Sequence, residues 1–148
     1  MKSARLDRAN TVIRGLLNES ASIVDPSRIV VTSKLTEETW PLDELKIQQV
    51  LINVLDNAVL ASDEGQVELD ASIEKGRLII RIRDHGPGID SGREEQIFEP
   101  FHTGRATGTG LGLAIARRVV SLHGGTIQAS NHPEGGALFT LDIPSDDA

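Results

Sequence analysis

The sequence of 148 residues contains no cysteine, and its few aromatic residues are Trp40, Phe98, Phe101 and Phe139. Without cysteine the chain has no disulfide, no thiolate metal site and no cysteine nucleophile. It also lacks an apolar run of the ~20 residues that a membrane-spanning helix needs, so we expect no membrane contact from this stretch. Residues 1–5 lead into polar chain rather than the apolar core of a signal peptide, which makes the cytoplasm the simplest compartment.

Positive charge is also scarce, with 15 Lys and Arg against 22 Asp and Glu and a net charge of −7. The basic residues are scattered, which argues against a nucleic-acid-binding surface. The four histidines lack the spacing of a zinc site, and no Ser/His/Asp triad can be named. The length predicts a single domain over residues 1–148, with loose ends at 1–6 and 145–148.

Hydrophobic periodicity predicts three long helices and about five strands. The helices are expected at 7–23, 43–62 and 108–123, with a short helical segment at 91–98. The strands are expected at 28–35, 66–73, 77–84, 126–130 and 137–143, with a short extended piece at 40–42. Hairpins prevail over strand–helix–strand alternation, which predicts an α+β fold: a two-layer α/β sandwich whose mixed sheet is covered on one face by the three helices.

Each of the three helices has a sequence feature that can be checked. Asp43 is expected to cap the second helix. In the first helix, Val12, Leu16 and Ile23 have helical spacing, with Ile13 and Leu17 beside them. The third helix is expected to bury an apolar stripe made of Leu111, Ile115, Val119 and Leu122.

An amide stripe interrupts the otherwise apolar second helix. Gln49, Asn53 and Asn57 are spaced four apart and therefore share one face. Buried amides without partners cost about 1–3 kcal/mol each, so neighbouring backbone or water satisfies them, or the stripe lines a polar cleft. In a cleft, an amide oxygen can coordinate Mg²⁺, which keeps several waters and binds substrate phosphates.

Asp84 ends a strand, and the alternation places it on the same face as the apolar residues Leu78, Ile80 and Ile82. A carboxylate directed toward the core needs hydrogen-bond donors. Either Asp84 caps its own turn through the amides of His85 and Gly86, or it accepts a hydrogen bond from a ligand amine.

Eleven of the fourteen glycines lie between Gly86 and Gly136. Gly108, Gly110 and Gly112 open the third helix, where unpaired N–H groups and the helix dipole favour an anion such as phosphate. Many glycine-rich loops are merely turns, so this segment alone decides nothing. It is not a Walker loop, and Leu113 stands where a dinucleotide fingerprint needs its third glycine.

Four segments in order resemble the histidine-kinase ATP-binding domain of the superfamily that also contains gyrase, heat-shock-90 chaperones and mismatch-repair ATPases. Residues 49–58 look like its asparagine box, residues 84–89 its first glycine box, residues 98–101 its phenylalanine box and residues 108–113 its second glycine box. Together they span about residues 42–144. The short loop after Phe101 is most similar to the nitrogen-regulation class of sensor kinases. The resemblance implies a Bergerat-type ATP-binding fold.

The resemblance also implies the roles of individual residues around Mg-ATP. Asp84 would accept from the adenine amine, which selects ATP over GTP, and Asn57 would bind Mg²⁺. Asn53 would line the phosphate and water side of the cleft. Residues 102–107 would form a lid, in which Arg105 either contacts the terminal phosphates or is simply solvated. The remaining cofactor-binding residues would be Ala58, Gly86, Gly88, Ile89, Phe101, Gly108, Thr109, Gly110, Leu111 and Gly112.

Two departures qualify this resemblance. Members that hydrolyse ATP with their own base carry Glu where this chain has Asn53, so intrinsic ATPase activity should be poor. No histidine lies in the helical setting that a phospho-acceptor needs, so the acceptor domain is expected to be a separate partner. The implied function is transfer of the ATP γ-phosphoryl group to a histidine on that dimerisation domain, with a response regulator downstream. The alternatives are an anti-sigma-type serine kinase and a nucleotide-binding interaction module.

Overall fold

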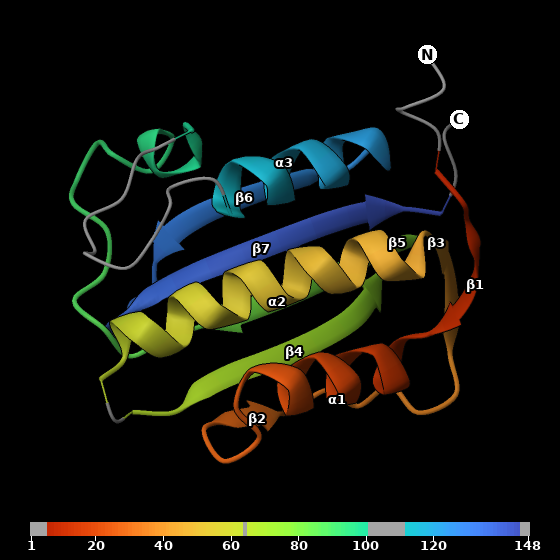
Figure 1. Ribbon diagram of the computed structural model, residues 1–148, viewed down its shortest axis with the longest axis horizontal. Coiled ribbons are helices and arrows are strands. Elements are labelled where there is room, and N and C mark those ends of the chain that lie inside the picture. Colours follow the sequence, from red (N-terminus) through yellow and green to blue (C-terminus); the bar gives the residue numbers. More distant parts are fainter. Residues whose placement is uncertain (1–5, 64, 101–111, 146–148) are drawn as a thin grey trace.

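The computed structural model describes residues 6–63, 65–100 and 112–145. Within these ranges the chain forms two sheets and three α-helices, and the helices alternate with strands along the chain (Figure 1). The helices are α1 (Ile13–Val24), α2 (Glu44–Ala61) and α3 (Gly112–Leu122), with a 3₁₀ helix, η2, at Gln96–Phe98. The strands are β1 (Ala9–Val12), β2 (Ile29–Val31), β3 (Thr39–Leu42), β4 (Val67–Glu74), β5 (Arg77–Arg83), β6 (Thr126–Asn131) and β7 (Ala137–Pro144).

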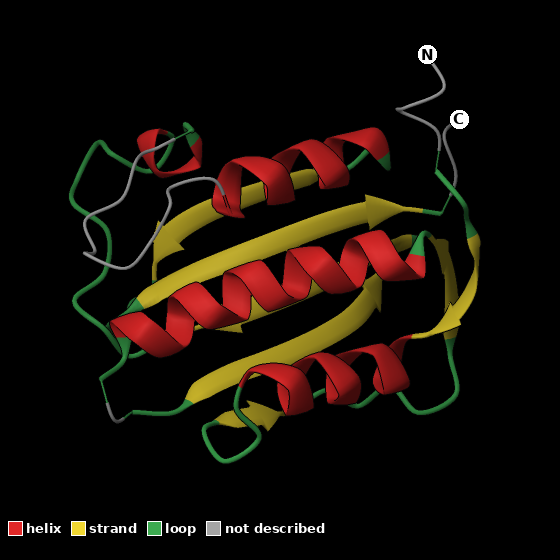
Figure 2. Cartoon of the chain, viewed as in Figure 1, coloured by secondary structure: helices red, strands yellow, loops and turns green. Residues whose placement is uncertain are grey.

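The main sheet is mixed and has five strands in the order β2-β4-β5-β7-β6. Its β2–β4 pair is parallel, while β4–β5, β5–β7 and β6–β7 are antiparallel. Figure 2 shows α1, α2 and α3 side by side on one face of this sheet. The predicted two-layer α+β sandwich is therefore confirmed.

The core lies between the helices and this sheet. Inward and outward residues alternate along β5 and β7, and Ile80, Ile82, Leu141 and Ile143 are fully buried. They meet the buried face of α2, whose buried residues are Ile47, Val50, Leu51, Val54, Leu55 and Ala58. The register pairs Ile80 with Leu141, so the buried faces of the two central strands match side by side.

The helix predicted at residues 7–23 was wrong in its first part. Residues 9–12 form a strand, β1, which pairs antiparallel with β3, instead of the first turns of a helix. The β-branched Thr11 and Val12 suit a strand, and the indole of Trp40 in β3 donates to the carbonyl of Pro144 at 3.2 Å. This bond ties the two-stranded sheet to the end of β7.

The apolar pattern of the first helix is only partly buried, and the buried stripe predicted for the third helix was partly wrong. In α1 the buried residues are Ile13, Leu16, Leu17, Ser20 and Ala21, while Ile23 is 54% exposed. In α3 they are Ala116 and Val120, while Ile115 is 47% exposed. Small residues occupy buried positions in both helices because helices that lie close together leave little room for large side chains.

Two shorter predictions were also too long. The strand expected at 28–35 is limited to β2, and only η2 is helical within residues 91–98. Asp43 does cap α2, since its side chain accepts from the amide of Lys46 at 3.2 Å. None of the described helices is long and apolar enough to cross a membrane.

Candidate functional site

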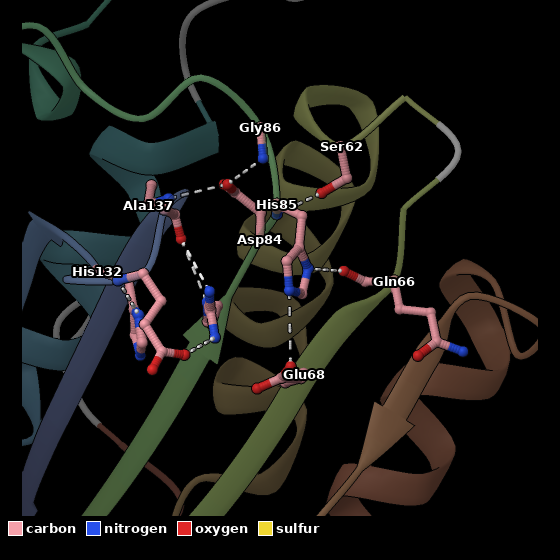
Figure 3. Close-up of polar contacts among 11 residues, drawn as sticks. Ser62, Gln66, Glu68, Asp84, His85, Gly86, His132 and Ala137 are labelled. Atoms are coloured by element: carbon pink, nitrogen blue, oxygen red, sulfur yellow. Dashed lines mark hydrogen bonds and ion pairs between the residues drawn. The ribbon is translucent and has the colours of Figure 1, made fainter.

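Asp84 follows the last residue of β5 and is only 3% exposed, as its position in the alternating pattern predicts. Its Oδ1 accepts two hydrogen bonds of 2.9 Å, one from the amide of Gly86 and one from the amide of Ala137 (Figure 3). The Asp84 amide in turn donates to the Ala137 carbonyl at 2.9 Å. The carboxylate is thus fixed between its own turn and the start of β7.

The two sequence-based alternatives for Asp84 therefore apply to different oxygens. Oδ1 caps the turn through Gly86, as one alternative predicts. Among the described residues no hydrogen bond ends on Oδ2, so this oxygen keeps its acceptor capacity. A carboxylate has about four lone-pair sites, and Asp84 can hold its turn and still accept from a ligand amine.

His85 does not share in this turn. Its amide donates to the hydroxyl of Ser62 at 3.0 Å, and its Nδ1 lies 2.6 Å from the carbonyl of Gln66. Its Nε2 lies 3.7 Å from the carboxylate of Glu68 in β4. In Figure 3 the His85 ring points toward Gln66 and Glu68, while the Asp84 side chain points toward Gly86 and Ala137.

The glycines of the first glycine segment are required by contacts within the chain. A Cβ at Gly86 would lie 2.4 Å from the carbonyl oxygen of Ala61 at the end of α2. Gly88 has a φ of +86°, which L side chains rarely adopt, and a Cβ there would lie 2.6 Å from Oδ1 of Asn131. The segment therefore lies directly against α2 on one side and against β6 on the other.

The amide stripe of α2 is exposed at Gln49 and half-buried at Asn53 and Asn57. Asn53 is satisfied by neighbours, as one sequence-based alternative expects: its Oδ1 accepts from Gln49 at 3.1 Å and its Nδ2 donates to the carbonyl of Gly112 at 3.2 Å. A Cβ at Gly112 would make only ordinary contact with Asn53, at 3.6 Å from its Cγ. Packing within the described chain does not require glycine at 112.

One helix therefore contacts both glycine segments. The positions 49, 53, 57 and 61 are each four apart on α2, so they follow one another along one side of the helix. The start of α3 meets this row at Asn53, and the first glycine segment meets it at Ala61. Asn53 and Ala61 are eight residues apart, which corresponds to about 12 Å along the helix axis. Ala58 is only 1% exposed and belongs to the core beneath this row.

The donor set of this row suits a cation that keeps most of its own water. No group of three or more His, Cys, Asp or Glu side chains that could hold a metal is found among the described residues. Mg²⁺ needs no such group, since one or two protein oxygens together with substrate phosphates and waters complete its octahedron. Asn57 and Asn53 are the neutral amide side chains in this row, which fits a metal brought in by a phosphate ligand.

A second cluster joins the residues before the second glycine segment to α3. Arg117 donates to both carboxylate oxygens of Glu95, at 2.8 and 3.2 Å, and its guanidinium lies 4.4 Å from the centre of the Phe98 ring. The bonds and charge of Arg117 lower the pKa of Glu95 below its usual value. Phe98 is buried and packs edge-on against Phe139 at 6.2 Å, so it anchors this cluster in the core.

Six predicted site residues lie outside the described residues: Phe101, Arg105, Gly108, Thr109, Gly110 and Leu111. Of the others, Gly86 lies against the end of α2, Gly88 and Ile89 lie against Asn131 of β6, and Asp84 bonds to Gly86 and Ala137. Asn53 meets Gly112 at mid-helix, and Asn57 and Ala58 follow Asn53 along α2. Sequence reasoning missed Ala137 and Asn131, which contact Asp84 and Ile89. Both contacts join residues more than forty positions apart, and no local sequence pattern signals them.

With this geometry established, residues 42–147 match the family described as "Histidine kinase-, DNA gyrase B-, and HSP90-like ATPase". That match covers well over half of the chain. The chain belongs to this ATPase family. The sequence resemblance to it is thereby confirmed.

The relatives of this ATPase domain are sensor kinases. It is 44% identical over 106 residues to Sensor protein KdpD of Escherichia coli, which covers 68% of this chain and 12% of the relative. It is 36% identical over 140 residues to the histidine-protein kinase AtoS of Escherichia coli, which covers 89% of this chain and 23% of the relative. The chain therefore spans less than a quarter of either protein.

Solved structures of histidine kinases share its fold. The catalytic domain of histidine kinase ThkA superposes with a TM-score of 0.88 at 27% identity, covering 96% of this chain and 98% of that one. Full-length ShkA in complex with AMPPNP gives a TM-score of 0.86 at 32% identity, covering 97% of this chain and 32% of that one. ThkA in complex with the response regulator protein TrrA gives 0.82 at 25% identity, covering 96% of this chain and 43% of that one. The chain thus corresponds to a histidine kinase catalytic domain.

Proposed function

We propose that the chain binds Mg-ATP along α2 and donates the γ-phosphoryl group to a histidine on a separate dimerisation domain. The observation that carries this proposal is that the first glycine segment and the start of α3 both contact one row of α2. An elongated ligand with a base at one end and phosphates at the other suits two such places, one beside Asp84 and one beside Asn53 and Gly112.

At the Asp84 end, Oδ2 would accept from the exocyclic amine of adenine. Guanine presents a carbonyl oxygen at the corresponding position, and two acceptors cannot hydrogen-bond. The buried setting of Asp84 makes such a mismatch costly because an unpaired buried group loses its full solvation. The half-buried Ile89 would provide an apolar wall for the ring.

At the Asn53 end, this chain's residues would hold the phosphates and orient them. Phosphoryl transfer needs positioning and neutralisation of charge more than covalent chemistry by the protein. Asn57 would hold Mg²⁺ through its amide oxygen, and the metal, when bound, supplies charge neutralisation at the phosphates. Since the Asn53 amide cannot accept a proton at neutral pH, we expect little hydrolysis of ATP by water.

The relatives limit how finely the kinase can be assigned. The expected likeness to the nitrogen-regulation class is not supported by KdpD and AtoS, the two relatives named above. We therefore propose a sensor kinase without assigning its class. Its further partner is proposed to be a response regulator, by analogy with the ThkA complex. We propose a cytoplasmic place for the domain, where ATP and such partners are found.

The test has two steps. A calorimetric titration measures binding of ATP with Mg²⁺, with GTP as the matched control ligand. The chain is then mixed with γ-labelled ATP and a purified histidine-containing dimerisation domain. We expect ATP binding and acid-labile label on the acceptor domain, since phosphohistidine is lost in acid.

Other outcomes would point elsewhere. Acid-stable label on a protein serine would favour the anti-sigma type of kinase. Tight ATP binding with no transfer to any acceptor would favour an interaction module that uses nucleotide as a structural ligand. Absence of ATP binding would overturn the whole proposal.

A further inference from the structure

Asn131, the last residue of β6, holds the backbone of Ile89 with both ends of its side-chain amide. Its Oδ1 accepts from the Ile89 amide at 2.7 Å, and its Nδ2 donates to the Ile89 carbonyl at 2.9 Å. These two bonds satisfy the donor and the acceptor of one residue, as a neighbouring strand would. The Ile89 backbone is thereby fixed although it belongs to no strand.

The position of Asn131 follows from the alternation along β6. Ile127 and Ala129 are buried on the helix-covered face, and Asn131 has the same parity. In the register of the sheet, Asn131 pairs with Ala137, and the Ala137 amide donates to Asp84. Asp84, Ala137 and Asn131 therefore lie in a row across three neighbouring strand ends.

The segment from Asp84 to Ile89 is consequently anchored at both ends. The Asp84 carboxylate fixes its start through Gly86 and Ala137, and Asn131 fixes its finish through Ile89. Gly88 makes room for the second anchor, since a Cβ there would lie 2.6 Å from Asn131 Oδ1. Asn131 itself is exposed, so core packing does not explain it.

We propose that Asn131 is a positioning residue for the adenine end of the site, acting through the place it gives to Ile89. This inference rests on the proposed ATP-binding function. It assigns no contact between Asn131 and the nucleotide. Its effect should therefore be equal for ligands that share the adenosine portion and differ in their phosphates.

The test compares Asn131→Ala and Asn131→Asp with Gln128→Ala, a matched control at an exposed position of the same strand. Calorimetry measures the affinities for ATP and ADP, and amide hydrogen exchange measures protection of the Ile89 N–H. Asn131→Ala should weaken ATP and ADP by the same factor of about ten, the effect of one to two lost hydrogen bonds. It should also speed exchange at Ile89, with melting temperature within a few degrees of wild type.

The second variant separates the two bonds. Asn131→Asp keeps the acceptor for the Ile89 amide, loses the donor and brings a carboxylate oxygen toward the Ile89 carbonyl. We expect it to weaken both nucleotides while Ile89 keeps more protection than in Asn131→Ala. Gln128→Ala should leave affinity and exchange unchanged.

Three results would overturn the inference: unchanged affinity in both variants, weakened affinity with unchanged exchange at Ile89, or weakening of ATP but not of ADP. A large drop in melting temperature with unchanged affinity well below it would assign Asn131 to folding alone, which also overturns it. If wild type itself binds no ATP, the proposed function fails instead, so the two failures are distinguishable.

Discussion

At the scale of single residues, Asp84 divides its work between its two oxygens. Oδ1 holds Gly86 and Ala137, and Oδ2 has no hydrogen bond from any described residue. The two oxygens can be tested apart because asparagine keeps one carbonyl oxygen and replaces the other oxygen by a donor. Substitutions of Asp84 can therefore separate stability of the turn from binding of a ligand.

Asp84→Asn should abolish detectable ATP binding while leaving the fold intact. The amide oxygen can still accept from Gly86 and Ala137, but an NH₂ group would face the adenine amine. Asp84→Ala should lose both functions and unfold more easily, by about 1–3 kcal/mol for the two amides left without their acceptor. Calorimetry measures the ATP affinity of the two variants, and urea unfolding measures their stability. Undiminished affinity in Asp84→Asn would remove the adenine assignment.

Asn57→Ala should weaken ATP binding only when Mg²⁺ is present. A ligand oxygen for the metal matters only with the metal bound, whereas a structural amide matters in either condition. Titrations in magnesium and in EDTA give the comparison, with Leu45→Ala, at a 79% exposed position of the same helix, as the control. Equal weakening in EDTA would make Asn57 structural.

At the scale of elements, the charged side chain of Asp43 stabilises the start of α2. Burial raises the pKa of Asp43, but bonds from the amides of Asp7 and Lys46 and the charge of Lys46 outweigh it, so the pKa lies below the usual 3.8. A depressed folded pKa contributes stability above the unfolded value, and this is lost as pH falls through the folded value. The cap therefore weakens in acid.

Asp43→Asn should separate the charge of this cap from its hydrogen bond. Asparagine still accepts from the Lys46 amide but carries no charge, so the difference in unfolding free energy from wild type should shrink below about pH 4. Asp43→Ala should cost about 1 kcal/mol at pH 7 as a lost cap. Urea unfolding from pH 7 to pH 3 measures both. A difference that stays constant over this range would contradict the assignment.

The cluster of Glu95, Phe98 and Arg117 is expected to stabilise the contact of η2 with α3. Arg117→Glu should lower the melting temperature, since it removes a cation–π contact worth about 0.5–1 kcal/mol and places two carboxylates together. Adding Glu95→Arg should recover part of the loss. Arg118→Glu is the control, because Arg118 is exposed and has no ion pair with the described residues. Equal losses of melting temperature in Arg117→Glu and Arg118→Glu would argue against the pairing of Arg117 with Glu95.

Sequence patterns predicted the elements well where large apolar residues face the core. The hairpin of β4 and β5 and the cap of α2 were confirmed, and strand parity alone placed Asp84 on the buried face. The patterns were wrong where the buried positions hold small residues, as at Ser20 in α1 and Ala116 in α3. A hydrophobicity pattern favours Ile23 and Ile115 instead, which are 54% and 47% exposed.

At the scale of the whole molecule, binding should appear as added stability. A ligand present at 100 times its dissociation constant, and bound only by the folded state, raises the free energy of unfolding by about 2.7 kcal/mol. We expect this shift with Mg-ATP and a much smaller one with GTP at the same concentration. Urea unfolding with each nucleotide measures it. An equal shift with both would argue against selection by Asp84.

The long-range contacts of the site could not be predicted from sequence. Asn131 meets Ile89, 42 positions away, only because β6 and β7 bring their shared turn beside the end of β5. Six of the fourteen predicted site residues lie at 101–111, outside the described residues, and the roles of all fourteen stay predictions. Order and spacing of the four motifs nevertheless identified the family.

The sequence of α2 contains neither glycine nor proline between Glu44 and Ala61. An uninterrupted helix has a constant rise and turn, so the separation of its two contact points is the same in every copy of the protein. Loops elsewhere can change length without altering it. A single residue inserted between Asn53 and Ala61 would instead turn one contact point by about 100° relative to the other. We expect evolution to vary this chain's turns more freely than the length of that helix.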